Sequence, residues 1–359
     1  GYDVVGVTLR QYTAPDPDPN PTSKGCCGLE DVEYARRACQ LLGVPHYLLN
    51  FEREFKAYVI DYFIGEYRRG RTPNPCLACN DRIKFDFLLR RSLALGADYL
   101  ATGHYARADR ANGRLRLLRA IDGSKDQSYV LYTLGQAELA RLLLPVGEYT
   151  KAEVRRTARE HGLPSADKPD SQEICFIPGR DYRSLLREHG GAQPGEVVDT
   201  AGRALGTHPG IGHFTIGQRH GLGIAAGRPL FVVGLDAARN RVIVGGPEEL
   251  LAAEVIASRV RYVSGAAPEG PLAARVQYRY RSPEVDAEVV PQGERALVRF
   301  REPQRALAPG QAIVFYRGEE GLGGGAIDEV RAACTTPAAA QELRVREPAV
   351  ARSGQEATV

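Results

Sequence analysis

The stretch LEDVEYARRACQLLGVPHYLLNF, residues 29–51, joins an amphipathic helix to a short apolar strand. Apolar side chains recur at helical spacing from Leu29 to Leu42, and Gly43 follows as a left-handed helix cap. The same spacing puts Cys39 on the apolar face, where we expect it to fill space in the core. Residues 46–51 then have the composition of a strand. A helix that leads directly into a strand is the repeating unit of an α/β fold.

The same alternation continues on both sides of that stretch. GYDVVGVTLR, residues 1–10, predicts a buried strand whose apolar residues are Val4, Val5, Val7 and Leu9. Helices are predicted over 52–67 and 81–95, and ADYLATGHY, residues 97–105, predicts a buried strand that runs into a loop. This order predicts a mainly parallel sheet with helices on both faces, whose ligands bind beyond the carboxyl ends of the strands.

After about residue 185 the pattern changes to short strands separated by glycine-rich segments. FVVGLDAARNRVIVGG (231–246) predicts a hairpin, and ALVRF (296–300) and AIVFY (312–316) predict further strands. The glycine clusters at 210–224 and 321–325 lack the lysine and the placement of a nucleotide-binding loop, so we expect tight β turns there. This half of the chain is predicted to be all-β, and residues 336–359, which lack an apolar period, to be a disordered tail.

Length and composition narrow the classes of function. The 359 residues carry a formal net charge of +3, too small a value to indicate a nucleic-acid partner by itself. No apolar run of about 18 residues is present, so we expect no membrane span. Seven cysteines, an odd number in a chain large enough to fold without disulfides, predict a reducing, cytoplasmic compartment. The chain has no methionine and opens inside a strand pattern, which predicts a polypeptide that is incomplete at its N-terminus.

RTPNPCLACNDRIKF, residues 71–85, holds Cys76 and Cys79 in a CxxC spacing. A zinc knuckle needs a second pair, whereas the next cysteine, Cys175, stands alone, and a thioredoxin motif does not carry this proline-rich lead. We expect Asn80 or Asp81 to cap the helix 81–95, so that Cys79 lies at the positive end of that helix. With Arg82 and Lys84 close by, Cys79 is predicted to be a reactive thiolate. A buried, inert pair is the alternative that the local sequence leaves open.

Three further segments carry residues suited to a site. Cys175 in DSQEICFIPG (170–179) has the surroundings of a buried cysteine in a strand. ATGHYA (101–106) places Gly103 and His104 after a predicted strand, which is either a ligand contact or a tight turn. SKDQSY (124–129) concentrates Lys125, Asp126 and Gln127 at a loop-to-helix start, which is either a contact surface or a solvated cap.

The segment ARVQYRYRS, residues 274–282, alternates basic and apolar positions. A strand over this range would place Arg275, Gln277, Arg279 and Arg281 on one face. Arginines beside exposed tyrosines suit phosphate and base contacts in RNA, and a solvated strand face is the alternative.

Taken together, these segments carry a resemblance: TPNPCLACNDRIKF, ATGHYA, SKDQSYVLYTL, DSQEICFI, TIGQRHGLGI, RYRSPE and PGQAIVFY. In their order and spacing, from residue 1 to about 330, the chain resembles the tRNA-specific 2-thiouridylases, which replace O2 of the wobble uridine by sulfur. The resemblance implies an α/β fold of the ATP-pyrophosphatase type (adenine nucleotide alpha hydrolase-like), followed by β domains. The implied units are the catalytic domain at 1–185, a central β-rich connecting domain at 186–252 and a C-terminal β-barrel with tRNA contacts at 253–335.

The resemblance also implies the chemistry. ATP, with Mg²⁺, adenylates O2 of the uridine, and AMP leaves when sulfur attacks. Cys175 receives a persulfide from a sulfur-donor protein, a cysteine desulfurase or a relay protein, and Cys79 is the partner nucleophile, which leaves a Cys79 to Cys175 disulfide. Motif matching assigns target-base contacts to Asn74, Pro75 and Cys76, ATP contacts to Leu9 and Gly103, and tRNA contacts to His104, Lys125, Asp126, Gln127, Arg279, Tyr280 and Gln311.

Two departures from the family pattern bear on function. A phosphate-binding loop of the Ser-Gly-Gly-Val-Asp-Ser type does not occur in the chain, so we expect that these 359 residues alone do not adenylate tRNA. Cys76 stands where many relatives carry aspartate, and the three thiolates of Cys76, Cys79 and Cys175 could hold a 4Fe-4S cluster whose open iron binds the sulfide. Persulfide and cluster are alternatives, as are two other classes: an ATP-pyrophosphatase ligase and an inactive RNA-binding protein.

Overall fold

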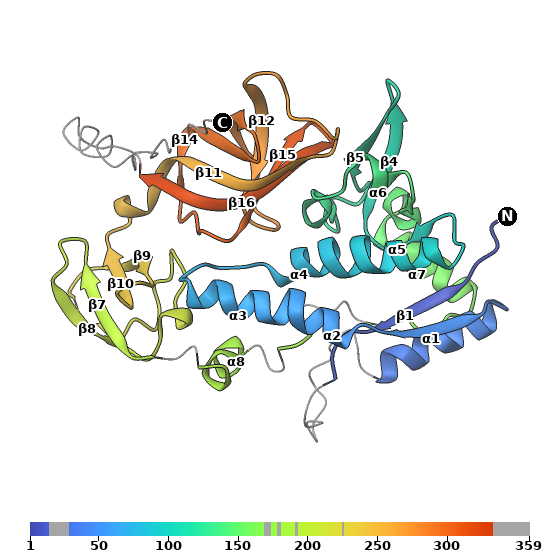
Figure 1. Ribbon diagram of the computed structural model, residues 1–359, viewed down its shortest axis with the longest axis horizontal. Coiled ribbons are helices and arrows are strands. Elements are labelled where there is room, and N and C mark those ends of the chain that lie inside the picture. The colour runs from blue at the N-terminus through green and yellow to red at the C-terminus, as the bar shows by residue number, and fades with distance from the viewer. Residues whose placement is uncertain (14–28, 169–173, 178–180, 191–192, 225, 333–359) are drawn as a thin grey trace, which may run out of the picture.

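The structure is a computed structural model (Figure 1). It describes residues 1–13, 29–168, 174–177, 181–190, 193–224 and 226–332, and the tail predicted at 336–359 lies outside these ranges. An α/β part, a small sheet and a barrel follow one another along the chain. The barrel folds back over the N-terminal helices, so segments far apart in the sequence lie side by side (Figure 1).

The N-terminal part contains two short pairs of parallel strands. Strand β1 (Gly6–Arg10) pairs with β2 (His46–Asn50), and β3 (Leu100–Ala101) pairs with β6 (Leu142–Leu143). The helical elements between and after them are α1 (Leu29–Leu41), α2 (Glu52–Phe55), the π-helix η1 (Lys56–Ile60), α3 (Asp61–Arg68), α4 (Pro75–Ala78), the π-helix η2 (Cys79–Leu88), α5 (Leu89–Ala94), the 3-10 helix η3 (Ser128–Leu131), α6 (Gln136–Leu139), the 3-10 helix η4 (Pro145–Glu148) and α7 (Lys151–Glu160). Parallel strands that alternate with helices confirm the predicted α/β class.

The strand predicted over residues 1–10 is shorter and more exposed than its composition indicates. Strand β1 begins only at Gly6, and Val4, Val5 and Val7 are 51%, 52% and 40% exposed. Leu9 packs against the core of the N-terminal part. The prediction of a buried strand is therefore wrong for the other three, because β1 is paired with β2 alone within the described residues.

Helix α1 packs closely against β1 at Gly6. A Cβ on Gly6 would lie 2.3 Å from the Cys39 sulfur and 3.5 Å from the Pro45 carbonyl oxygen. Cys39 is half-buried, and its sulfur occupies the space that a side chain on Gly6 would need. This contact agrees with the predicted role of Cys39 in packing.

The central part is a four-stranded sheet with the order β8-β7-β10-β9. Its elements are α8 (Tyr182–Glu188), β7 (Gly195–Asp199), β8 (Ala204–His208), the 3-10 helix η6 (Ile211–His213), β9 (Phe231–Asp236) and β10 (Arg241–Gly245). Strands β9 and β10 form the antiparallel hairpin predicted over 231–246. Gly217, Gly221 and Gly223 have φ angles of +88°, +73° and +69°, which confirms turns in the first glycine cluster.

The C-terminal part is a closed barrel of six strands. A short 3-10 helix, η7 (Glu248–Leu250), leads into β11 (Leu251–Tyr262), β12 (Leu272–Gln277), β13 (Val285–Gln292), β14 (Arg295–Arg305), β15 (Ala312–Arg317) and β16 (Glu320–Ala332). Pairing of β11 with β16 closes the barrel around buried side chains such as Val298 and Phe315. The hairpin of β4 (Ala106–Ala111) and β5 (Arg114–Arg119) extends this sheet through Leu117 and Leu118, which ties the N-terminal part to β16.

The glycine cluster at 321–325 lies inside β16 rather than in a turn. A Cβ on Gly323, whose φ is +142°, would lie 2.1 Å from the Arg261 carbonyl oxygen, and one on Gly324 would lie 2.6 Å from that of Ile313. The prediction of tight turns is therefore wrong for this cluster, because its glycines let β16 approach β11 and β15 closely. Within the described residues, no helix combines the length and the apolar character needed to cross a membrane.

Candidate active site

The helix of the CxxC segment begins at Pro75 rather than at residue 81. The Asn74 side-chain oxygen accepts a hydrogen bond from the Cys76 backbone N–H at 3.0 Å, and Pro75 takes the first helical position. Helical structure then continues through α4, η2 and α5 to Ala94. The predicted cap at Asn80 or Asp81 is therefore wrong. Cys79 lies one turn inside the helix, where its own N–H bonds the Pro75 carbonyl and the terminal dipole has weakened.

The Cys79 sulfur is half-buried and accepts a hydrogen bond from the Gln11 side-chain amide, with 3.4 Å between Nε2 and Sγ. Cys175 is also half-buried and lies in a turn, not in the predicted strand; the Ile177 N–H bonds the Ile174 carbonyl across it at 3.0 Å. Both cysteines pack against the same apolar cluster, which includes Phe55, Phe63 and Phe176. Two cysteines that lie far apart in the sequence therefore border one apolar cluster.

Cys76 differs from these two cysteines in its surroundings. It is exposed, in the first turn of α4, and is not part of the apolar cluster that Cys79 and Cys175 contact. Among the described residues, no three His, Cys, Asp or Glu side chains are arranged to hold a metal ion. The donor set predicted for a 4Fe-4S cluster is thus not assembled among the described residues in this conformation.

Asn80, next to Cys79, anchors the helix to a buried histidine. His104 Nε2 donates to Asn80 Oδ1 at 3.2 Å, and Asn80 Nδ2 donates to the Val130 carbonyl at 3.4 Å. The Thr102 hydroxyl donates to His104 Nδ1 at 2.9 Å, the pattern of a neutral imidazole protonated at Nε2. Burial, with a smaller effect of the Lys84 charge, lowers the pKa of His104 to about 3, so the ring is neutral at physiological pH.

This placement bears on the tRNA contact predicted for His104. The side chain is 7% exposed, and both ring nitrogens are engaged by protein groups. In this conformation both ring nitrogens are hydrogen-bonded within the protein and are not available to bind RNA. The ring instead positions Asn80 and the helix that carries Cys79.

Tyr129 joins two segments that carry predicted tRNA residues. Its hydroxyl donates to the Ala312 carbonyl at 2.9 Å, directly after Gln311, and its ring centroid lies 5.8 Å from that of Tyr280. Tyr280 is 39% exposed, and the Arg281 guanidinium lies 5.2 Å from its ring centroid. Tyr129, itself buried, therefore links the N-terminal part to the barrel beside the exposed Tyr280.

The loop that leads into Asn74 lies against the same part of the barrel. The Thr72 N–H bonds the Pro309 carbonyl at 2.7 Å, and a Cβ on Gly310 would lie 3.0 Å from the Thr72 nitrogen. The predicted target-base residues Asn74 and Pro75 thus follow a segment fixed beside Gln311.

Arg279 and Tyr280 lie in a turn, not in the strand predicted over 274–282. Strand β12 ends at Gln277, whose side chain is buried and donates to the Ser282 carbonyl at 3.0 Å across that turn. The Arg279 guanidinium donates to the Ala306 carbonyl. The predicted alternation is wrong beyond Gln277, because the chain reverses there and its side chains no longer share a strand face.

The segment 125–127 is held mainly through Asp126. Its carboxylate, 7% exposed, pairs with Arg119 at 2.5 Å and accepts from the Ser128 hydroxyl at 2.8 Å, while Arg119 also pairs with Glu284 of the barrel. Asp126 therefore orders the loop and ties it to the barrel. The Gln127 side-chain oxygen accepts from the Tyr105 N–H at 3.0 Å, and Lys125 is half-buried beside it.

The two residues predicted to contact ATP follow or end short parallel strands. Leu9 lies near the carboxyl end of β1, and Gly103 is exposed two residues after β3. A Cβ on Gly103 would meet no atom within 4 Å, so open space adjoins the backbone there. Both residues lie at the carboxyl ends of parallel strands, where α/β proteins bind ligands, although the strands belong to two separate sheets.

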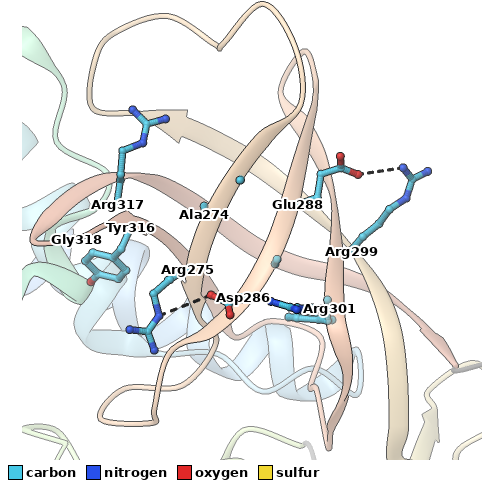
Figure 2. Close-up of a pocket in the computed structure, with 12 residues that line it drawn as sticks. Ala274, Arg275, Asp286, Glu288, Arg299, Arg301, Tyr316, Arg317 and Gly318 are labelled. Carbon is cyan, nitrogen blue, oxygen red and sulfur yellow. Dashed lines mark hydrogen bonds and ion pairs between the residues drawn. The ribbon is translucent and has the colours of Figure 1, made fainter.

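A separate hollow of about 600 Å³ lies on the barrel, over β12, β13, β14 and β15 (Figure 2). Ion pairs of Arg275 with Asp286 and of Arg299 with Glu288 stand at its walls (Figure 2). None of the residues assigned from the family motifs lines this hollow, so it is distinct from the region around Cys79.

The chain is similar to known protein families and to known full-length proteins. Three family models match consecutive parts of the chain: the tRNA methyl transferase HUP domain at 1–179, the tRNA methyl transferase PRC-barrel domain at 183–246 and the aminomethyltransferase beta-barrel domain at 252–327. The chain is 52% identical over 346 residues to the tRNA-specific 2-thiouridylase MnmA of Roseiflexus castenholzii, which covers 91% of this chain and 93% of the relative. It is 50% identical over 335 residues to that of Moorella thermoacetica, with 92% and 94% covered. The chain belongs to the tRNA-specific 2-thiouridylase family.

The family models and the relatives name different group transfers. The models refer to methyl transfer, whereas the full-length relatives are thiouridylases. Two cysteines packed on one apolar cluster suit sulfur transfer, for which thiolates are the reacting groups. The geometry of this 2-thiouridylase family member thus agrees with the names of its relatives.

Several residues of the region around Cys79 were not predicted from the sequence. They are Gln11, Asn80 as a buried anchor, Thr102 and Tyr129. Asn80 follows Cys79 directly and was interpreted as a helix cap, so a signal was present but was assigned the wrong role. The other three carry no local signal, because their partners come from distant segments.

Proposed function

We propose that this protein catalyses ATP-dependent 2-thiolation of the wobble uridine of tRNA, with sulfur delivered as a persulfide on Cys175. The observation that carries the proposal is the packing of Cys79 and Cys175 against one apolar cluster. Asn80, directly after Cys79 in the helix, donates to the Val130 carbonyl, and the adjacent buried Tyr129 lies against the exposed Tyr280. Reacting sulfur and bound RNA would then meet at the junction of the N-terminal part and the barrel.

The proposed reaction has two stages, adenylation of the uridine and transfer of sulfur. The uridine O2 attacks the α-phosphorus of ATP, pyrophosphate leaves, and O2 becomes part of a good leaving group. The terminal persulfide sulfur on Cys175 then attacks C2, and the Cys79 thiolate attacks the Cys175 sulfur. The S–S bond of the persulfide breaks with its electron pair going to the transferred sulfur, AMP departs, and a Cys79 to Cys175 disulfide remains for reduction by an external thiol.

The surfaces around the cysteines suit the two substrates. Gly103 leaves open space after β3, where adenine nucleotide could approach the backbone. Asn74 and Pro75 begin the helix one turn before Cys79, so a uridine held there would lie close to the Cys79 sulfur. Tyr280 offers an exposed aromatic face flanked by Arg281, which suits base stacking and phosphate contact. The O2 edge must leave its stack for reaction, so we expect the target base to be flipped out.

A thiolation assay tests the proposal. The product of the complete gene is incubated with unmodified tRNA, ATP, Mg²⁺ and a persulfide-donating protein, and 2-thiouridine is measured by mass spectrometry of nucleosides. We expect Cys79→Ser and Cys175→Ser each to lower product formation about a hundredfold or more. Cys39→Ser is the matched control, because Cys39 packs under β1 and should leave the rate unchanged. Undiminished thiolation by either active-site variant would overturn the proposal.

Cys76→Ser separates the persulfide route from the cluster alternative. A persulfide mechanism should tolerate this change, because Cys76 is exposed and outside the apolar cluster that Cys79 and Cys175 contact, and serine keeps the size and the polar contact predicted with the target base. A 4Fe-4S mechanism loses a ligand and therefore activity. Iron and sulfide analysis of anaerobically purified protein provides the second measurement, and stoichiometric iron together with an inactive Cys76→Ser variant would refute the persulfide route.

A further inference from the structure

The Gln11 side chain reaches Cys79 from a different element of the fold. Gln11 directly follows β1, where the Phe51 N–H bonds the Arg10 carbonyl at 2.9 Å and holds the end of the strand. The side chain is 6% exposed, and its Nε2 donates to the Cys79 sulfur at 3.4 Å. The amide is therefore largely shielded from water where it contacts the sulfur.

Two of the features that the sequence offered for activating Cys79, the helix start and Arg82, are directed elsewhere. Helix α4 begins a full turn before Cys79, so the dipole acts on Asn74 and Pro75 instead. Arg82 pairs with Asp81 at 3.4 Å and with Asp86 at 3.7 Å, which compensates its charge. The Gln11 amide is a donor aimed directly at the Cys79 sulfur.

A carboxamide N–H is suited to that task. It donates and cannot take up the thiol proton, and a hydrogen bond to sulfur strengthens when the sulfur carries negative charge. A donor of this kind favours the thiolate over the thiol. The thiolate is the form that attacks in thiol–disulfide exchange.

We propose that Gln11 is a further catalytic residue, whose side-chain amide stabilises and aims the Cys79 thiolate for attack on the sulfur of Cys175. The inference rests on the proposed nucleophilic role of Cys79. Gln11 keeps both amide hydrogens throughout. It stabilises the charge before attack, and its hydrogen bond weakens as the Cys79 electron pair enters the new S–S bond. Strand alternation puts Leu9 and Gln11 on the same side of the chain, so the nucleotide and the thiolate would be served by one strand end.

Alkylation with iodoacetamide at a series of pH values tests this role. Gln11→Met keeps the length of the side chain and removes the donor, and Gln40→Met on the exposed surface of α1 is the matched control. Trypsin releases Cys76 and Cys79 in one peptide, residues 72–82, so fragment mass spectrometry reads Cys79 against Cys76 as an internal reference. Equal melting temperatures of the two methionine variants show that Gln11→Met folds.

Removal of the Gln11 donor is expected to lower the thiolate fraction of Cys79 about tenfold at pH 7. The effect on the alkylation rate is partly offset, because a more basic sulfur is more nucleophilic. With a Brønsted coefficient of about 0.45, Cys79 alkylation in Gln11→Met should slow about threefold at pH 7 and should become about threefold faster than wild type at strongly alkaline pH. The half-maximal rate should move up by about one pH unit, and Cys76 should not change. A purely structural role would lower the rate by the same factor at every pH, and that result or an unchanged Cys79 profile would overturn the proposal.

The result of the alkylation test does not depend on whether the proposed function is correct. Alkylation involves neither tRNA nor ATP, so the crossing of the two pH profiles is decided whether or not Cys79 transfers sulfur. In single-turnover thiolation, Gln11→Met should slow the reaction about threefold at pH 7 with unchanged tRNA affinity. If Cys79→Ser still thiolates tRNA while the crossing is observed, the proposed function fails and the interaction of Gln11 with the thiolate stands.

Discussion

Acid should weaken the structure around Cys79 through His104. In the folded protein the pKa of this ring is about 3, lowered by burial and less by Lys84, against 6.5 for an ordinary histidine. Because the folded-state pKa is lowered, the unfolded chain takes up the proton more readily. The stabilisation is therefore fully present above pH 6.5 and is lost as the pH falls toward 3. Between pH 7 and pH 5 the unfolded chain takes up this proton mainly below pH 6.5. At about 1.4 kcal/mol for each pH unit below that value, the loss in the free energy of unfolding is about 2 kcal/mol.

The variant His104→Gln isolates this effect, because glutamine can donate to Asn80 and does not titrate. Wild type and variant are unfolded with urea at pH 7 and at pH 5 and followed by far-UV circular dichroism. We expect the wild type to lose about 2 kcal/mol more than the variant between the two pH values. His208 and His213, whose pKa values are also lowered chiefly by burial, are present in both proteins and cancel.

Equal losses in the two proteins would refute this reasoning. So would an NMR titration of the histidine ring protons in which His104 protonates near its ordinary pKa while the protein is still folded. Either result would mean that water reaches the ring, and the Asn80 and Thr102 hydrogen bonds would then not hold it neutral.

Three further substitutions test the packing and the RNA surface. Gly6→Ala should lower the free energy of unfolding by about 2 kcal/mol, because its Cβ meets the Cys39 sulfur. In a urea-denaturation double-mutant cycle Cys39→Ala should restore most of that loss, and additive losses would contradict the contact. Gly323→Ala should cost about 3 kcal/mol or more, because a positive φ and a backbone clash coincide there; an unchanged melting temperature would argue against this closure of the barrel. Tyr280→Ala should weaken tRNA binding about tenfold in a fluorescence titration by removing a stacking surface, whereas Tyr47→Ala, also exposed, should not, and equal effects of the two would count against the assigned surface.

Local pattern predicted the elements that depend on neighbouring residues. The helix α1 with its left-handed Gly43, the hairpin β9–β10 and the strands around 296–300 and 312–316 all appear where the sequence indicated them. Each is specified by the spacing of apolar residues or by a turn residue within a few positions.

The errors have specific physical reasons. Asn74 followed by Pro75 is a local signal for a helix start, but Asn80 and Asp81 offer a second one, and only packing decides between them. The Asn80 side chain is buried and bonded to His104, so it does not cap a helix. The glycines at 321–325 were misassigned because their need for space arises from β11 and β15, which are remote in sequence.

The sequence by itself indicated the family and the residues to which the proposed chemistry is assigned. Cys79 and Cys175 can be singled out from their motifs, because reactivity belongs to the residue type and the motif to a family. Only the tertiary structure decided what surrounds them: the Gln11 amide on the Cys79 sulfur, the neutral His104 behind Asn80, and Tyr129 between two domains. Hydrogen-bond partners and burial depend on which distant segments meet, and that depends on the packing of the whole chain rather than on any stretch of it.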